Sequence, residues 1–155
     1  MAETRWLDER ELAAWEGFLT LGAVLNRRVE QQLKDDAGLS HQQYEVLTRL
    51  SAAPGGALRM TELAGVALTS KSGLTYQVGQ LEKAGLVCRK ACASDDRGVV
   101  ASLTEQGWAK LRETAPGHAT LVRELFRDGL TDQQFEGFAA GIDALLARLA
   151  PCPGA

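Results

Sequence analysis

The sequence lacks any long apolar run. No stretch of its 155 residues approaches the roughly 18 uninterrupted apolar residues that a membrane helix needs. The first ten residues are charged and contain no apolar signal region, so export is not expected. With 45% hydrophobic and 24% charged residues, the chain has the composition of one globular domain. We therefore expect no membrane partner and a cytoplasmic location.

Cysteine and histidine are scarce. The three cysteines, Cys88, Cys92 and Cys152, are an odd number at spacings that fit neither a disulfide framework nor a zinc site. The two histidines, His41 and His118, fall in different predicted helices, and neither has a carboxylate pair or a phosphate-binding glycine loop beside it. We expect a reducing compartment, no bound metal or cofactor, and no enzymatic activity.

Excess positive charge is also lacking. The formal net charge is −3, which by itself does not favour nucleic acid as a partner. Residues 58–104, however, carry six basic and four acidic residues, whereas the remainder carries 11 basic and 16 acidic ones. The middle third is therefore mildly basic between acidic flanks. An imbalance this small also fits chance. Whether nucleic acid is the partner therefore has to be judged from the order of the structural elements.

The N-terminal part of the chain has helical periodicity. Apolar residues at steps of three and four predict a helix over Asp8–Ala37, and Gly38 is a natural C-terminal stop. Ser40 with Gln43 is a capping-box pattern that begins a second helix. The sequence Pro-Gly-Gly at residues 54–56 ends this helix.

The C-terminal part has the same periodicity. Thr104 is placed to cap a long helix, which we expect to be kinked at Pro116. Thr131 with Gln134 repeats the capping-box signal and begins a last helix. The tail, residues 151–155, is expected to be disordered.

Between these helical flanks the pattern changes. It predicts, in order, a short extended piece, a brief helix capped by Thr61, a tight connection, a third helix closed by Gly85, and two strands joined by a turn. Their ranges are Leu58–Met60, Thr61–Ala67, Leu68–Thr69, Ser70–Ala84, Leu86–Ala93, Ser94–Gly98 (the turn) and Val99–Leu103. This order is typical of a winged helix-turn-helix.

We therefore predict a mainly α protein with a small β-hairpin wing. Residues 1–38 form an N-terminal dimerisation helix, residues 39–104 a winged helix-turn-helix DNA-binding domain, and residues 105–150 the C-terminal dimerisation helices. Trp6, Trp15, Phe18, Phe126, Phe135 and Phe138 supply more apolar surface than one small winged helix can cover. A symmetric homodimer would bury that surface and place two recognition helices about one DNA turn apart.

The third helix of this block is the candidate recognition helix. Leu74, Val78 and Leu81 fall in one stripe that would pack on the preceding helix. The outer face then carries Ser72, Tyr76, Gly79 and Lys83, with Thr75 and Gln80 on its flanks. Such hydroxyl, amide and cationic groups suit base edges and phosphates in a major groove. Ser70, Lys71 and Ser72 lie at the positive end of the helix dipole, which suits phosphate. The alternative is an ordinary solvated helix face.

The hairpin strengthens this interpretation. Arg89 and Lys90 lie on its first strand, and Arg97 lies at its tip, where an arginine can reach an adjacent minor groove. Asp95 is placed to hold that guanidinium by a bidentate hydrogen bond. The alternative is a plain β-turn, because Asp and Gly are ordinary turn formers.

The run TELAGVALTSKSGLTYQVGQLEKAGLV, followed by SDDRGVVASLTEQG, resembles the core signature of the MarR family of transcriptional regulators. The match spans about 50 residues and continues upstream through LSHQQYEVLTRL. The resemblance implies a dimeric regulator, more often a repressor, held together by its N- and C-terminal helices. It also implies binding to a palindromic operator in double-stranded DNA and, often, release by a small aromatic ligand.

Carried over by position, the resemblance places DNA contacts on Ser70, Thr75, Tyr76, Gln80, Arg89 and Arg97. Tyr76 and Gln80 depart from the commoner pattern, because arginine is frequent at both places. The operator sequence therefore stays open.

If a ligand is sensed, its pocket is expected where the helical arms meet the winged domain. Trp15, Phe18, His41 and Tyr44 are the candidates, because rings and one titratable group could converge there. The alternative is that the aromatic residues form the dimer core and His41 is a surface residue of a first helical turn.

Two further interpretations stay open. Redox sensing is one, because Arg89 and Lys90 beside Cys88 could lower the pKa of a thiol. Cys88 and Cys92 are four residues apart, about 13 Å at the rise of a strand, which is too far for a direct disulfide. The other is a dimeric winged-helix module that binds another protein, for which neither Arg97 nor Asp95 is needed.

Overall fold

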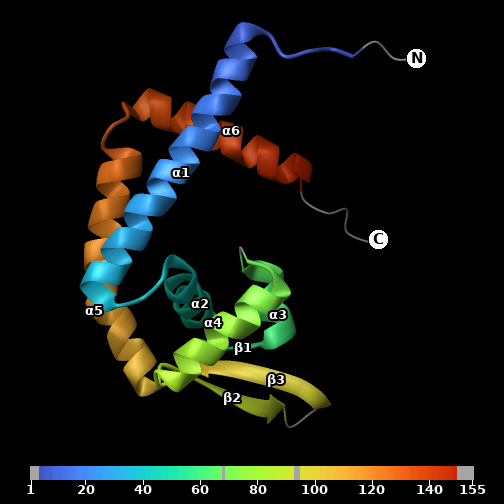
Figure 1. The fold of residues 1–155 in the computed structure, drawn as a ribbon, viewed down its shortest axis with the longest axis vertical. Coiled ribbons are helices and arrows are strands. Elements are labelled where there is room, and N and C mark those ends of the chain that lie inside the picture. The colour runs from blue at the N-terminus through green and yellow to red at the C-terminus, as the bar shows by residue number, and fades with distance from the viewer. Residues whose placement is uncertain (1–3, 68, 93–94, 150–155) are drawn as a thin grey trace. The chain divides into compact units, whose positions relative to one another are not determined.

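The computed structural model describes residues 4–67, 69–92 and 95–149, with the backbone alone at Cys92 and residues 95–97. Contacts divide the chain into two compact units, residues 1–118 and 119–155, and each is described by itself. The elements, of which Figure 1 labels the α-helices and the strands, are α1 (Glu9–Ala37), α2 (His41–Ala52), a 3₁₀ turn (Pro54–Gly56), β1 (Ala57–Arg59), α3 (Met60–Val66), α4 (Lys71–Lys83), β2 (Val87–Cys92), β3 (Asp95–Leu103), α5 (Glu105–Val122), a π-helical segment (Arg123–Arg127) and α6 (Asp132–Leu149). The predicted class, mainly α with a small antiparallel sheet, is confirmed.

The caps of α1 and α2 are those that the sequence predicts. The side chain of Asp8 accepts a hydrogen bond from the backbone N–H of Glu11, and the Glu11 side chain accepts one from Asp8. Ser40 and Gln43 form the same reciprocal pair at the start of α2. Gly38 ends α1 with φ 66°, a left-handed conformation that glycine adopts at little cost.

The core of the first unit lies beneath α4. Leu74, Val78 and Leu81 are buried along the predicted stripe. They share this core with fully buried leucines of α2 and α3, which are Leu47, Leu50 and Leu63. Burying each such side chain contributes about 1.5–3 kcal/mol. The core therefore fixes which face of α4 points outward.

The sheet has the strand order β1-β3-β2, antiparallel throughout. The predicted turn at Ser94–Gly98 is wrong from Asp95 onward, because β3 already begins at Asp95. Ala91 pairs with Val99 but Cys92 pairs with Asp95, with a register shift between Ala91 and Cys92. The extra residues of β3 are taken up at this bulge, which lets pairing continue past it. Ser94 lies outside the described residues.

The start of α3 also differs from the prediction. The strand ends at Arg59 and the helix begins at Met60, so Thr61 lies inside α3 and is not its cap. The backbone N–H of Arg59 donates to the Glu62 carboxylate at 2.9 Å. Glu62 therefore satisfies the backbone N–H of Arg59, the residue that precedes the helix, which is the part of a capping box that a glutamate at this position supplies.

Helix α5 begins tightly against the end of α4. The Thr104 hydroxyl accepts from the backbone N–H of Gly107 at 3.0 Å and donates to the carbonyl of Gly85 at 2.6 Å. A Cβ atom at Gly107 would lie 2.1 Å from the backbone oxygen of Leu86, so only glycine fits. The predicted cap at Thr104 is confirmed.

The helix does not end at Pro116, and the kink expected there stays a prediction. Helix α5 continues through Pro116 to Val122, and the irregular part is the π-helical segment that follows. A proline ring removes one donor but leaves the next turns intact where other bonds hold the helix.

The second unit holds the end of α5, the π-helical segment and α6. The Phe126 ring lies 6.3 Å from that of Phe135 and 5.6 Å from that of Phe138, and Arg127 lies 4.8 Å above the Phe135 ring. Thr131 and Gln134 cap α6 as predicted. No residue of α6 is buried within Asp132–Leu149, all of which are described.

Among the described residues, no helix is both long enough and apolar enough to cross a membrane. The predicted tail, residues 151–155, lies outside the described residues.

Candidate nucleic-acid interface

The first turn of α4 presents hydroxyl groups and one cation. Ser70 is its N-cap, and its Oγ atom accepts from the backbone N–H of Gly73 at 3.2 Å. The Ser72 hydroxyl lies 3.3 Å from that of Ser70, and Lys71 and Ser72 are both exposed. These three predicted contact residues therefore lie together at the positive end of the helix dipole.

The exposed face of α4 continues through Thr75, Tyr76 and Gln80. Tyr76 is 62% exposed, and its hydroxyl accepts from Gln80 Nε2 at 2.8 Å. This bond leaves the Tyr76 O–H and the Gln80 carbonyl oxygen available to a partner. Thr75 donates to the backbone oxygen of Lys71 at 3.0 Å, so its hydroxyl can only accept. Tyr76 and Gln80 occupy the two positions at which the family resemblance leads us to expect arginine. Here they form a neutral pair that is already hydrogen-bonded.

Arg89 of β2 is held by Glu82, the last acid of α4. Arg89 Nε and Nη2 donate to Glu82 Oε2 at 2.9 and 2.6 Å, and the backbone N–H of Arg89 donates to Oε1 at 3.1 Å. The hydrogen bonds from the Arg89 side chain and backbone hold the pKa of Glu82 below its usual 4.5. Sequence reasoning missed Glu82, because a separation of seven residues across a helix end and a strand start follows neither local period.

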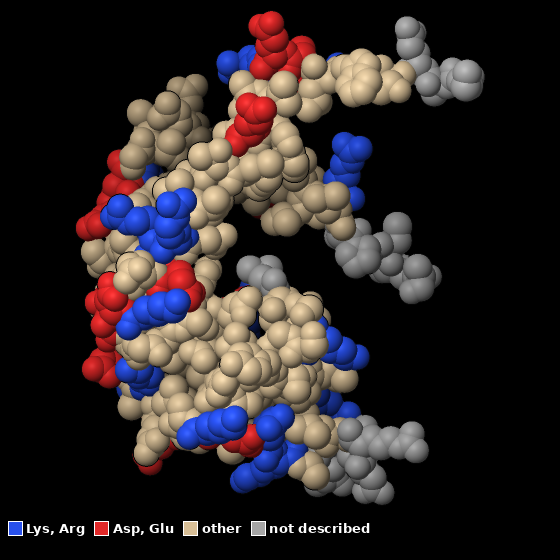
Figure 2. Space-filling view, viewed as in Figure 1, with Lys and Arg blue, Asp and Glu red and all other residues tan. Residues whose placement is uncertain are grey.

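For two of the predicted wing residues, the structure describes the position of the backbone but not of the side chain. Asp95 and Arg97 both lie on β3, and their side chains lie outside what the structure describes. The brace of Arg97 by Asp95 therefore stays a prediction. Lys90 is exposed on β2. In Figure 2, lysine and arginine side chains are visible over α4 and the hairpin, and others are spread over the rest of the view.

The four predicted pocket residues occupy two different places in the first unit. Trp15 and Phe18 lie on the first half of α1, 53% and 56% exposed, with ring centroids 6.2 Å apart. His41 and Tyr44 lie on α2. Neither Trp15 nor Phe18 lines the two hollows described next.

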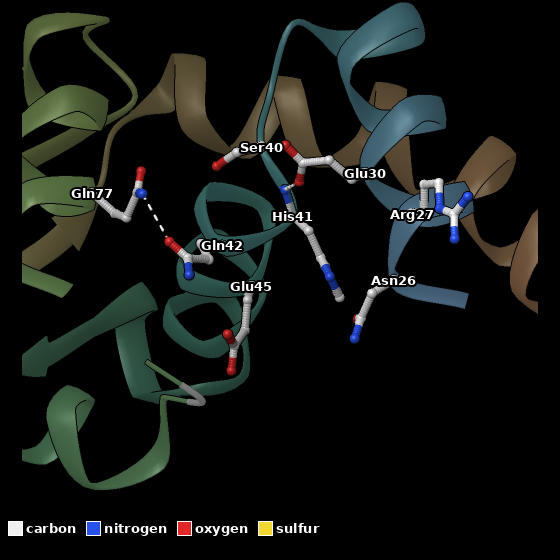
Figure 3. A pocket seen from close by; sticks show the side chains of 8 residues that line it. All are labelled: Asn26, Arg27, Glu30, Ser40, His41, Gln42, Glu45 and Gln77. Carbon is white, nitrogen blue, oxygen red and sulfur yellow. Dashed lines mark hydrogen bonds between the residues drawn. The ribbon is translucent and has the colours of Figure 1, made fainter. Parts of the chain in front are cut away.

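A polar hollow of about 670 Å³ lies where α1, α2 and α4 meet, with His41 in its wall (Figure 3). Its lining consists of Asn26, Arg27, Glu30, Ser40, His41, Gln42, Glu45 and Gln77. Gln77 of the candidate recognition helix donates to the Gln42 side chain at 2.9 Å. The backbone N–H of His41 donates to Glu30 at 2.7 Å, and this bond lowers the pKa of Glu30. The hollow is therefore linked directly to α4.

A second hollow, of about 440 Å³, also has His41 in its wall. It is lined by His41, Tyr44, Glu45, Thr48, Arg49, Ala52 and His118. The Tyr44 and His118 rings lie 4.6 Å apart, and His118 Nδ1 lies 3.3 Å from Gln32 Oε1. Burial, with a smaller contribution from nearby His41, lowers the pKa of His118, and burial raises the pKa of Tyr44. Sequence reasoning missed His118 here, because it is far from Tyr44 along the chain.

One cysteine side chain can be described. Cys88 is half-buried on β2, with its Sγ atom 3.1 Å from the Ser102 hydroxyl. The side chain of Cys92 and all of Cys152 lie outside the described residues, so redox sensing stays an open interpretation. Within the described part of the chain, no group of three His, Cys, Asp or Glu side chains could hold a metal ion.

Comparison with known proteins agrees with this geometry. The MarR family profile matches residues 39–99. The structure is similar to that of Sco3205, a MarR family transcriptional regulator from Streptomyces coelicolor solved in complex with DNA, with a TM-score of 0.92 and 39% identity over 97% of this chain and 94% of that one. It is also similar to AbsC, a MarR family transcriptional regulator from the same organism, with a TM-score of 0.88 and 36% identity over 94% and 98% of the two chains.

A curated relative gives the same family context. The HTH-type transcriptional repressor YetL of Bacillus subtilis (strain 168) is 29% identical over 112 residues, which are 72% of this chain. The match spans 66% of the length of that relative. From the winged fold, the exposed face of α4 and these similarities together, the chain belongs to the MarR family of DNA-binding transcriptional regulators.

Proposed function

We propose that this regulator is a repressor that binds a palindromic operator as a homodimer. The observation that carries the proposal is the exposed face of α4, which presents hydroxyl, amide and cationic groups from Ser70 to Lys83. The one acid within α4, whose residues are all described, is Glu82, and it is bonded to Arg89. A face of this kind suits base edges and phosphates in a major groove.

Two of the similar proteins support this assignment. Sco3205 was solved in complex with DNA, which supports DNA as the partner of the equivalent surface. YetL is named a transcriptional repressor, which supports repression over activation.

The homodimer is supported by apolar side chains that the chain leaves uncovered. On α1 they are Leu12, Trp15, Phe18, Leu19, Leu21 and Val24, and on α6 they are Leu145, Leu146 and Leu149. A monomer in water rarely exposes so many large apolar side chains on two helices. A symmetric interface would cover them and set two copies of α4 about 34 Å apart, one turn of DNA.

Selection of bound sequences from a random pool of double-stranded DNA tests the proposal. We expect an inverted repeat whose half-sites are separated by about 10 base pairs. Selected sequences without an inverted repeat would overturn the palindromic operator, and a monomer by sedimentation at micromolar concentration would overturn the dimer.

The wing has its own test within this proposal. Arg97→Ala should lower operator affinity and reduce the slope of log K against log salt by about one unit, because one phosphate or minor-groove contact is lost. The dimer should stay intact. The control is Arg112→Ala, which replaces an exposed arginine of α5. If both variants bound the operator with equal affinity, the alternative of a module that binds another protein would be favoured.

The release of this repressor by a small aromatic ligand is the second part of the proposal. We assign the binding site to the hollow that contains Tyr44, His118 and Arg49, because it offers two rings and a guanidinium to an aromatic carboxylate. Arg49 Nε lies 3.6 Å from Glu45 Oε1 in the same hollow, so the ligand carboxylate would compete with Glu45 for this guanidinium. His41 connects this hollow to the one that reaches Gln77 on α4. Trp15 and Phe18 are assigned to the dimer face.

Benzoate is a suitable probe for this site. Titrated into the complex with the selected operator, it should release DNA, and Arg49→Gln should raise the concentration required roughly tenfold, the cost of one charge-assisted hydrogen bond. Operator binding without benzoate should be unchanged in this variant. If benzoate released DNA from the wild type and the variant at equal concentrations, Arg49 would not be part of the binding site. If benzoate released no DNA at any concentration, aromatic carboxylates would be excluded as effectors.

A further inference from the structure

A hydrogen bond joins the side chains of α2 and α4 outside the residues predicted to contact DNA. Gln77 of α4 donates from Nε2 to Oε1 of Gln42, the second residue of α2, at 2.9 Å (Figure 3). The two residues are 35 positions apart along the chain, and both line the polar hollow where α1, α2 and α4 meet. The bond therefore ties the candidate recognition helix to the start of a different helix.

The start of α2 is itself anchored. His41 is the first residue of α2, so its backbone N–H has no acceptor within its own helix. It donates instead to the Glu30 carboxylate on α1 at 2.7 Å. Ser40 caps the same turn by accepting from the backbone N–H of Gln43. Gln42 therefore extends from a backbone that is held on α1, and its carbonyl oxygen is a fixed acceptor for Gln77.

The core and this bond restrain α4 in different ways. Leu74, Val78 and Leu81 are buried beneath α4, but the burial of apolar surface has no preferred direction. A hydrogen bond has a preferred distance and angle. By helical spacing, Gln77 lies on the flank of α4, between the buried stripe and Gln80. A bond at this flank therefore opposes rotation of α4 about its own axis, which would move the outer face.

We propose that Gln42 is a positioning residue for DNA recognition, because through Gln77 it holds α4 in the orientation that base contacts need. The proposal rests on the proposed operator binding and adds a residue that does not touch DNA. Base contacts require side chains placed to within about 0.5 Å, whereas the release of counterions from phosphates depends on charge. Neither glutamine is charged. Loss of the bond should therefore reduce the preference for the operator and leave the general affinity for DNA unchanged.

Binding to the selected operator and to a scrambled duplex of equal length tests this role. The ratio of the two dissociation constants measures the preference for the operator. Gln42→Ala and Gln77→Ala should each lower this preference roughly three- to tenfold, the range expected when one neutral hydrogen bond is lost. Because the two residues act as a pair, the double variant should lose no more than either single variant. The salt slope should equal that of the wild type in all three variants.

Two further variants separate positioning from a general loss of structure. Gln42→Glu keeps an acceptor for Gln77, so it should keep the preference for the operator, although its charge weakens binding to both duplexes. The control is Gln31→Ala, which removes an exposed glutamine of α1 that bonds to Asp35 within its own helix and should leave the preference unchanged. Urea denaturation and sedimentation would establish that all variants are folded and dimeric.

Four results would each overturn the role of Gln42. An unchanged preference in Gln42→Ala, with or without a lower urea midpoint, would make the bond merely structural. A loss of preference in Gln77→Ala alone would make Gln77 a direct base contact. Additive losses in the double variant would mean that the two residues act separately, and an equal loss in Gln42→Glu and Gln42→Ala would mean that the acceptor is not what matters.

Failure of the proposed function looks different from failure of this role. The wild type would then select no palindrome. The preference can still be measured on any sequence that the wild type selects, so the comparison of the Gln42 and Gln77 variants does not depend on the symmetry of the operator.

Discussion

The surface formed by α4 and the hairpin differs from the apolar faces of α1 and α6 in how its groups are prepared. On the first surface, polar side chains already bond to one another, as in the Tyr76–Gln80 and Glu82–Arg89 pairs. On the apolar faces, Trp15, Phe18 and Leu146 are more than half exposed. The polar side chains of the first surface are held in place before a partner binds. The apolar side chains of α1 and α6 are removed from water only when a partner covers them.

This difference has a physical basis. Polar side chains can stay exposed to water at little cost in free energy. Hydrogen bonds to their neighbours can also hold them in place, which reduces the conformational entropy lost on binding. Exposed apolar side chains gain free energy only when a second surface covers them. Variants of the two regions should therefore fail in different ways.

The largest effect is expected inside the winged block itself. Leu47→Ala removes a fully buried side chain of α2 and should lower the free energy of unfolding by about 2–5 kcal/mol, from lost burial and a cavity. Val66→Ala, at an exposed position of α3, should cost less than about 0.5 kcal/mol. Urea denaturation at one fixed protein concentration measures both, and similar losses would contradict this picture of the core.

The next largest effect is expected on the apolar faces. Leu146→Asp places a charge where α6 is apolar and exposed, so the dimer should dissociate at least about tenfold more readily, because an unpaired charge is costly to bury. Ala140→Asp adds the same charge to the opposite side of α6 by helical spacing and should leave the dimer intact. Sedimentation over a concentration series distinguishes them, and equal dissociation would place the interface elsewhere.

A smaller effect is expected at the Glu82–Arg89 pair. Glu82→Gln frees the Arg89 side chain and removes a negative charge near the DNA, so binding to random DNA should strengthen while the preference for the operator falls. Each change should be roughly two- to fivefold, as is usual for exposed ion pairs. Glu113→Gln, at an exposed position of α5, is the control for loss of one acidic charge. An unchanged preference for the operator in Glu82→Gln would show that Glu82 does not position Arg89.

The smallest effect is expected from the titration of His118. Burial lowers its pKa from 6.5, so the folded state holds fewer protons there than the unfolded state. The stability contributed by the neutral ring is complete above pH 6.5 and is lost as the pH falls through 6.5 toward the folded pKa. His118→Gln should therefore lose less stability than the wild type between pH 7.5 and about 5.5.

Urea midpoints at these two pH values measure the difference. Glu30, whose pKa lies below 4.5, does not titrate in this window. An equal pH dependence of the wild type and the variant would remove His118 from this role.

Most of the helices and the candidate recognition face could be predicted because their signals are local. Capping pairs such as Ser40 with Gln43 are three residues apart, and the stripe of Leu74, Val78 and Leu81 follows one helical period. The hairpin register could not be predicted in the same way. Its bulge beside Cys92 depends on pairing across strands, which leaves no period in either strand.

By itself, the sequence determined the order of the elements, the family and the side of α4 that points outward, because burial selects an amphipathic helix face by its period. Tertiary structure alone decided which distant side chains meet. Glu82 holds Arg89, Tyr44 packs against His118, and Gln77 bonds to Gln42. Such pairs form where the packed core brings different elements together, and nothing in the spacing of the residues along the chain records that meeting.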